Sequence, residues 1–248
     1  MREIVILSIV QGICEWFPVS SSGHLFLFHK ILGIKSDITL DIFLHFSSLF
    51  VIFIFFKREI LKLVKSFFLF KNEDENFKIV VYIIAASLVT FFIGLLLKDR
   101  KFLENKNFVS SGFFITTLFL FFSDKSKKTQ KINFKISLLI GFSQGIALIP
   151  GISRSGATIS SAKICGLNDE DAFKFSFLLA IPSIIGAIII KMDEIKNIEL
   201  EYIITGFIVS FIIGLLTLFL LQKIVMKRKF KYFCFYTFIV FLFSLFII

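Results

Sequence analysis

Cysteine and proline are both scarce in this sequence. The 248 residues include three cysteines, three prolines and one tryptophan. The cysteines are odd in number, lie far apart and are embedded in apolar sequence, so they indicate neither a disulfide framework nor a metal cluster. The chain also has no polar stretch long enough to fold as a soluble domain between its apolar segments.

Hydrophobic residues dominate instead. They make up 56% of the chain, phenylalanine alone occurs 37 times, and the mean hydropathy is +0.89. Most apolar runs approach the roughly 20 residues that cross a bilayer. This composition predicts a single polytopic membrane domain covering residues 1–248. The apolar runs lie at about 40–56, 79–97, 108–122, 136–149, 173–190, 202–222 and 232–248.

The charge is strongly basic, with 28 Lys and Arg residues, 18 acidic residues and a net charge of +10. The cations lie between the apolar runs, where they set membrane topology and contact anionic headgroups. We therefore expect a membrane environment and no nucleic-acid partner. The stretch from Ile4 to Val19 lacks a small-residue cleavage site and continues directly into a polar motif, so we expect no cleaved signal peptide.

The sequence contains an internal repeat at a shift of 133 residues. Repeat one, about 3–122, and repeat two, about 136–248, would each contain a helical hairpin followed by three spans. Because three is odd, the two copies would have opposite orientations, as in many transporters. The predicted fold class is an all-α polytopic membrane protein with two inverted repeats, each a re-entrant helix pair plus three transmembrane helices. The shift places Gln11, Ser20, Ser22, Gly23 and Gly33 on Gln144, Ser153, Ser155, Gly156 and Gly166.

Loop charges test this topology independently. Segments 57–78, 123–135 and 223–231 are rich in Lys and Arg, whereas 98–107 and 191–201 have fewer. The positive-inside rule puts the first three in the cytoplasm, and they are the alternate loops that three-plus-three spans require. Both termini are then expected outside.

Two short motifs interrupt the apolar sequence, EWFPVSSSGH at 15–24 and PGISRSGAT at 150–158. Pro18 and the Pro150-Gly151 pair break the surrounding hairpins into arms too short to cross a bilayer comfortably. Such re-entrant tips are tolerated at bilayer depth only where they are buried in protein or line a wet cavity. We therefore expect the two tips to meet near the midplane and to form the site.

The second tip is rich in hydrogen-bond donors and has no acidic residue. Arg154 offers a planar fork of donors that matches phosphate oxygens. Glycine allows backbone N–H groups to approach an anion, and the helix that follows adds its positive end. The alternative is that Arg154 snorkels or pairs structurally with Glu15. The other candidate anion ligands are Ser153, Ser155, Gly156 and Thr158.

The first tip supplies an acid and an imidazole. Gln11 and Glu15 are i, i+4 neighbours and line one helix face. Glu15 could hold a divalent cation or act as a general base, and His24 could transfer a proton or attack phosphorus. Ser20, Ser21, Ser22 and Gly23 lie between these two groups.

Three further aromatic or polar residues lie within or near the apolar runs. Trp16 is expected to anchor or pack the fold rather than to act in catalysis. The roles of His29 and His45 stay open, although His45 is a polar group within a predicted span.

Together the tips favour phosphoryl transfer to water. Glu15 and His24 would face Arg154 across the two tips, because neither tip carries all three kinds of group. A site at bilayer depth implies a phosphate carried by a lipid. The competing hypotheses are a lipid flippase or secondary transporter, which share the inverted-repeat plan, and a non-catalytic scaffold.

The two motifs and FSFLLAIP at 175–182 closely resemble those of the undecaprenyl-diphosphate phosphatase family, also called the bacitracin-resistance proteins. The resemblance spans nearly the whole chain. It implies hydrolysis of undecaprenyl diphosphate to undecaprenyl phosphate and inorganic phosphate in the bacterial plasma membrane. That reaction recycles the lipid carrier of cell-wall synthesis. The resemblance also implies a divalent cation, Mg²⁺ or Ca²⁺, and a site that opens to the outer side. The oligomeric state is left open, and a homodimer is one candidate.

Carried over by position, the resemblance makes Glu15 the acidic motif residue and a metal ligand. Ser21 and His24 are alternative nucleophiles or acid–base groups. Gln11 departs from family members that have Glu there, so a mechanism that requires two carboxylates is in doubt. The residues implied to bind the diphosphate are Ser153, Arg154, Ser155 and Thr158.

Overall fold

The computed structural model describes residues 1–33, 38–69, 74–97, 106–124, 130–191 and 200–247, and every regular element in these ranges is a helix. The elements are α1 (Arg2–Cys14), α2 (Ser21–Leu32), α3 (Ile38–Phe55), α4 (Lys57–Phe68), α5 (Glu75–Leu96), α6 (Lys106–Phe122), α7 (Phe134–Ile146), α8 (Arg154–Ile164), α9 (Asp169–Lys191), α10 (Leu200–Met226), η3 (Phe230–Tyr232) and α11 (Phe233–Ile247).

Several of these helices are suited to a bilayer. Among the described residues, four segments are long and apolar enough to cross it, namely Glu75–Leu96, Asp169–Ile190, Leu200–Met226 and Phe230–Ile247. Shorter apolar helices accompany them at Leu44–Phe55, Asn107–Phe122 and Phe134–Ile146. The prediction of an all-helical polytopic membrane protein is confirmed.

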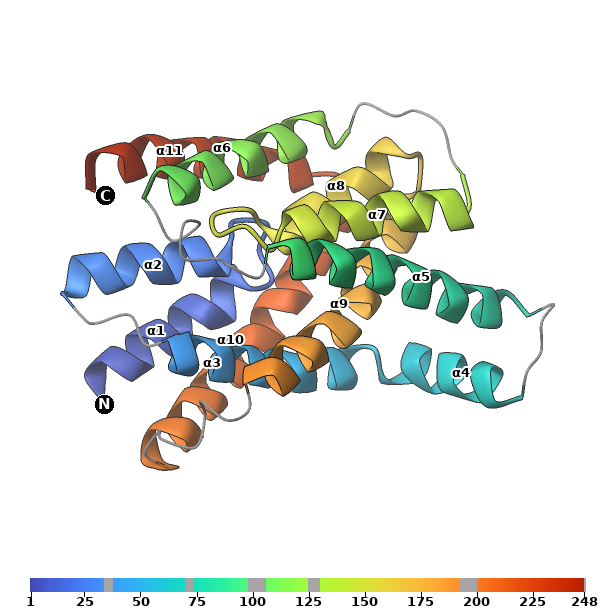
Figure 1. The fold of residues 1–248 in the computed structure, drawn as a ribbon, viewed down its shortest axis with the longest axis horizontal. Coiled ribbons are helices and arrows are strands. Elements are labelled where there is room, and N and C mark those ends of the chain that lie inside the picture. Colours follow the sequence, from blue (N-terminus) through green and yellow to red (C-terminus); the bar gives the residue numbers. More distant parts are fainter. Residues whose placement is uncertain (34–37, 70–73, 98–105, 125–129, 192–199, 248) are drawn as a thin grey trace.

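Most of the helices follow the long axis of the molecule, α9 and α10 run obliquely across them, and α6 pairs with α11 along one edge (Figure 1). The N- and C-termini lie at the same end of the molecule, and α1 starts there. Helix α7 starts at the opposite end and runs towards the middle (Figure 1). This arrangement is compatible with the inverted repeat, whose orientation in a bilayer stays a prediction.

Residues paired by the 133-residue shift have matching local roles. Ser20 caps α2 and Ser153 caps α8, and each hydroxyl accepts a hydrogen bond from the backbone N–H three residues later, at 3.2 and 3.1 Å. Gly33 and Gly166, just beyond the ends of the same two helices, both have positive φ, at 66° and 94°. The repeat therefore describes the start and the end of each second hairpin arm.

One expectation about segment 57–78 was incomplete. Its first part is not a loop but helix α4, which follows α3 almost without a break and buries Leu63 and Ser66. The high charge of this segment hid its amphipathic period, because its apolar residues occupy only one face. The expectations for loops 98–107 and 191–201 fall largely outside the described residues, which omit 98–105 and 192–199. The expectation for loop 123–135 falls partly outside them, because 125–129 are omitted.

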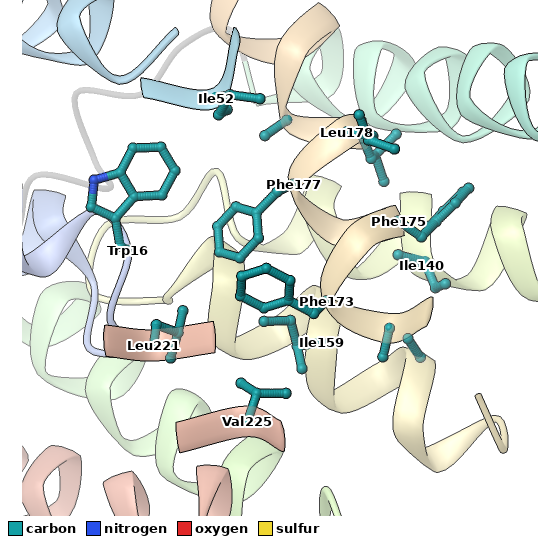
Figure 2. Packing of buried hydrophobic residues seen from close by; sticks show 14 of the residues in the cluster. Trp16, Ile52, Ile140, Ile159, Phe173, Phe175, Phe177, Leu178, Leu221 and Val225 are labelled. Atoms are coloured by element: carbon teal, nitrogen blue, oxygen red, sulfur yellow. The ribbon is translucent and has the colours of Figure 1, made fainter. Parts of the chain in front are cut away.

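Trp16 anchors the first tip in the main hydrophobic core. Its side chain is fully buried, and its ring centroid lies 5.5 Å from that of Phe177 on α9. Figure 2 shows the indole beside Phe177, with Phe173 and Ile159 further along the same cluster. A Cβ atom at Gly214 of α10 would lie 2.7 Å from the indole nitrogen, so α10 approaches Trp16 closely. The packing role expected for Trp16 is confirmed.

Because this indole joins the first tip to α9 and α10, we expect Trp16→Ala to lower the free energy of unfolding by about 3–5 kcal/mol. Trp16→Phe should lower the free energy of unfolding by less, because the aromatic contact with Phe177 is partly kept. Denaturant unfolding in detergent micelles measures both changes. Equal stability of Trp16→Ala and wild type would contradict this account of the core.

Candidate functional site

The two tips meet near the middle of the molecule (Figure 1). The Arg154 guanidinium donates through Nη2 to Glu15 Oε1, which joins the second tip to the first by an ion pair. Ser155 adds a hydrogen bond of 3.3 Å from its hydroxyl to the backbone oxygen of Phe17. The prediction that the tips come together is therefore confirmed for Glu15 and Arg154, and so is their pairing, which the sequence left as an alternative.

The first tip turns sharply between α1 and α2. Ser20, directly before α2, has φ 71° and ψ 100°. A non-glycine residue in that region is strained by about 1–3 kcal/mol, and such strain persists where surrounding contacts hold it in place. Ser20 has such contacts: its hydroxyl caps α2, and its carbonyl oxygen accepts hydrogen bonds from the backbone and from the ring of His24. The strained turn therefore fixes where α2 begins.

The second tip is held by α6. Thr116 Oγ1 accepts a hydrogen bond from the backbone N–H of Ser153 at 2.9 Å and lies 3.0 Å from the carbonyl oxygen of Gly151. Gly151 has φ 87°, and a Cβ atom there would lie 2.1 Å from the backbone oxygen of Val109. Only glycine fits this crossing. Arg154 therefore starts α8 from a turn that is fixed against α6.

Four side chains surround the carboxylate of Glu15, whose side chain is 4% exposed. Arg154 contacts Oε1. Ser21 donates to Oε2 at 2.7 Å, and Gln11 Nε2 lies 3.2 Å from the same oxygen. His45 Nδ1 on α3 lies 3.0 Å from Oε2 and 2.9 Å from Gln11 Nε2. Hydrogen bonds and an opposite charge together make a buried carboxylate tolerable at this depth.

His24 lies in a separate set of contacts. Its Nδ1 is 2.8 Å from the Ser20 carbonyl oxygen, and its Nε2 is 2.8 Å from the Tyr236 hydroxyl on α11. None of the described contacts joins His24 to Glu15 or Arg154. The expectation that His24 faces Arg154 across the tips stays a prediction.

The other candidate site residues make their hydrogen bonds mainly within their own tip. Ser22 is exposed and lies 3.3 Å from the Ser20 hydroxyl, and Ser155 makes the equivalent contact with Ser153 at 3.2 Å. The backbone N–H groups of Gly23 and Gly156 serve the two helix caps described above.

Thr158 points towards the neighbouring helix. Its hydroxyl is fully buried, donates to the Arg154 carbonyl oxygen at 2.8 Å and lies 2.5 Å from the Ser176 hydroxyl on α9. Contact with a diphosphate therefore stays a prediction for Thr158.

Sequence reasoning missed two contributors to this region and left the role of a third open. The open one is His45, whose position as a polar group within an apolar span was the available signal. Thr116 is one of many hydroxyl residues in apolar helices, so nothing in the sequence singles it out. Tyr236 is 212 residues from His24, and no local pattern connects the two.

Among the buried polar atoms that have no hydrogen-bond partner in the described residues, two belong to side chains that contact Glu15. They are Arg154 Nη1, a donor, and Gln11 Oε1, an acceptor. Buried unpaired atoms of this kind can be satisfied by a water molecule, an ion or a ligand. The donor suits an anion and the acceptor suits a cation, and the two belong to side chains that both contact Glu15.

The fold and the site define a polytopic membrane protein whose polar centre is built by two broken helix pairs, one from each half of the chain. A family model described as bacitracin resistance protein BacA matches residues 4–243. The chain belongs to this family.

Curated relatives agree over the full length. A Thermosipho melanesiensis protein named undecaprenyl-diphosphatase is 38% identical over 246 residues, which are 97% of this chain and 96% of that protein. A Methanococcus vannielii protein of the same name is 35% identical, with 99% of this chain and 100% of that protein covered. A third, from Borrelia hermsii, is 34% identical, and the match covers 94% of each chain.

Thr116 provides a test of how the second tip is held. We expect Thr116→Val to lower the free energy of unfolding by about 1–3 kcal/mol, because the buried N–H of Ser153 loses its partner. Thr116→Ser keeps the hydroxyl and should stay near wild type in the same denaturant measurement. If the Val and Ser variants were equally stable, the hydroxyl would not be what holds the tip.

Proposed function

We propose that this protein is an integral membrane phosphatase that hydrolyses undecaprenyl diphosphate to undecaprenyl phosphate and inorganic phosphate. The name shared by the curated relatives supports this substrate. The observation that carries the proposal within the structure is the buried, unpartnered Nη1 of Arg154 beside the carboxylate of Glu15. The product would re-enter cell-wall synthesis as the lipid carrier, and the activity would confer bacitracin resistance.

Arg154 binds the diphosphate. Its Nη2 stays with Glu15 while Nη1 donates to a phosphoryl oxygen, and the N-terminus of α8 adds its positive end. A planar guanidinium can make both contacts at once, because its donors point in different directions. Developing negative charge on the phosphoryl oxygens is thereby stabilised.

The first tip supplies the proton chemistry. Ser21 already donates its proton to Glu15 at 2.7 Å, which is the geometry of a hydroxyl paired with a base. His24 presents its Nε2 to a hydroxyl at 2.8 Å and is the alternative group for attack or proton transfer. Single variants at Ser21 and His24 separate these two routes.

A divalent cation, Mg²⁺ or Ca²⁺, fits the oxygen atoms of the first tip. Mg²⁺ sites commonly use one or two carboxylates together with substrate phosphates. Glu15 and the unpartnered Gln11 Oε1 would hold the ion, and no cluster of three or more His, Cys, Asp or Glu occurs among the described residues. When bound, the ion would neutralise negative charge on the diphosphate.

The proposed location is the bacterial plasma membrane, with the site open to the outer side. The apolar helices support a membrane location, and the alternating loop charges support this orientation. A flippase or secondary transporter is the second candidate function, because its architecture would be similar. The donor-rich pairing of Arg154 with an acid favours hydrolysis.

Purified protein should release inorganic phosphate from undecaprenyl diphosphate in detergent. Phosphate release should stop when divalent cations are chelated and should recover when Mg²⁺ is added.

The value of kcat/KM should fall about 100-fold in Arg154→Lys, because an ammonium cannot contact Glu15 and a phosphoryl oxygen in the same planar geometry.

Arg228→Lys is the matched control, because the Arg228 side chain is 86% exposed, and its rate should equal that of wild type. A wild type that releases no phosphate would overturn the proposed hydrolysis. Full activity of Arg154→Lys would overturn the role of the guanidinium.

The orientation can be tested by cysteine labelling after Cys14, Cys165 and Cys234 are replaced by alanine. Lys62→Cys on α4 should react only with reagent on the cytoplasmic side, and Lys30→Cys near the end of α2 only with reagent outside. Both lysines are exposed. Labelling of both positions from the same side would contradict the proposed topology.

A further inference from the structure

His24 is held at both ring nitrogens. Its Nδ1 lies 2.8 Å from the Ser20 carbonyl oxygen, which can only accept a hydrogen bond. In the neutral ring Nδ1 therefore carries the proton and Nε2 is the acceptor. The Tyr236 hydroxyl lies 2.8 Å from Nε2 and is placed to donate to it. This contact joins α2 to α11, near the opposite end of the chain.

Two aromatic rings pack against the His24 imidazole. Tyr236 stacks on it with 5.7 Å between centroids and 8° between planes. Phe113 of α6 meets it edge-on, at 5.4 Å and 88°. The imidazole is thus packed between an α6 side chain and an α11 side chain.

The position of Tyr236 is itself fixed. The next residue, Thr237, lies 2.9 Å from Thr117 of α6, hydroxyl to hydroxyl. Further along the pair, Ser244 donates to Ser110 at 2.8 Å. Two interhelical hydroxyl contacts therefore hold α11 against α6, so the Tyr236 ring is carried by a supported helix.

We propose that Tyr236 is a positioning residue for His24: its hydroxyl donates to Nε2, which reinforces the tautomer set by the Ser20 carbonyl, and its ring packs against the imidazole. The inference rests on the proposed phosphatase function. Whether His24 attacks phosphorus or transfers a proton, the working atom is Nε2, since Nδ1 is engaged by the backbone of the first tip. Without the Tyr236 hydroxyl, Nε2 loses its only partner among the described contacts, and the ring is held by a hydrogen bond at Nδ1 alone.

Tyr236→Phe keeps the stacked ring and removes only the hydroxyl. We expect kcat to fall about 10-fold, as for other residues that orient a functional histidine. KM should stay within about twofold, because Tyr236 does not bind the diphosphate. Tyr232→Phe is the matched control: Tyr232 is exposed, stacks on Phe235 and should tolerate the same change at the wild-type rate.

A measurement that needs no turnover tests the same claim. The chain has three histidines, so protein labelled with ¹⁵N-histidine gives a small set of ring signals, and His24→Gln identifies those of His24. Tyr236→Phe should shift the His24 Nε2 signal and leave the other two histidines unchanged, whereas Tyr232→Phe should shift none.

An unchanged Nε2 signal in Tyr236→Phe would overturn the contact, and an unchanged kcat would overturn its role in positioning. Both results differ from failure of the proposed function, in which the wild type itself releases no phosphate while the ¹⁵N comparison can still be made.

Discussion

The ion pair between Glu15 and Arg154 is the contact on which the site depends. Each tip brings one charge into an apolar helical protein, and an unpaired charge in that setting is strongly unfavourable. Pairing the two charges makes both hairpins tolerable at once. The same pairing joins one half of the chain to the other, so the stability of the tips and the assembly of the site have a common cause.

The proposed activity would use the neighbours of this pair. The carboxylate is also contacted by Ser21, Gln11 and His45, while Arg154 Nη1 has no hydrogen-bond partner among the described residues. A pair with every atom satisfied would only hold the hairpins together. Under the proposed function, the unpartnered donor would bind the diphosphate and the unpartnered Gln11 oxygen would bind the cation.

Much of this architecture could be predicted from sequence, because the bilayer imposes simple rules. Apolar run lengths indicated the spans, proline and glycine indicated the breaks, and the shift of 133 residues paired the caps Ser20 and Ser153. The complementary chemistry of the tips predicted that Glu15 and Arg154 would be brought together. These features depend on local composition or on charge balance, which a sequence displays directly.

The parts that escaped prediction depend on packing between distant segments. Helix α4 was taken for a charged loop, because its apolar face is meaningful only once a neighbouring helix covers it. His45 reaches Glu15, and Tyr236 reaches His24, only through the way in which α3 and α11 pack. No spacing within the sequence encodes those contacts.

The most direct test of the account is a double-mutant cycle on the two charges, with Glu15→Gln, Arg154→Gln and the double variant compared with wild type by denaturant unfolding in detergent. Each single variant leaves a buried charge unpaired, so each should be strongly destabilised. The double variant should be more stable than the sum of the single effects predicts, by about 1–3 kcal/mol. Single effects that add to within about 0.3 kcal/mol would mean that the two tips are not joined through this pair.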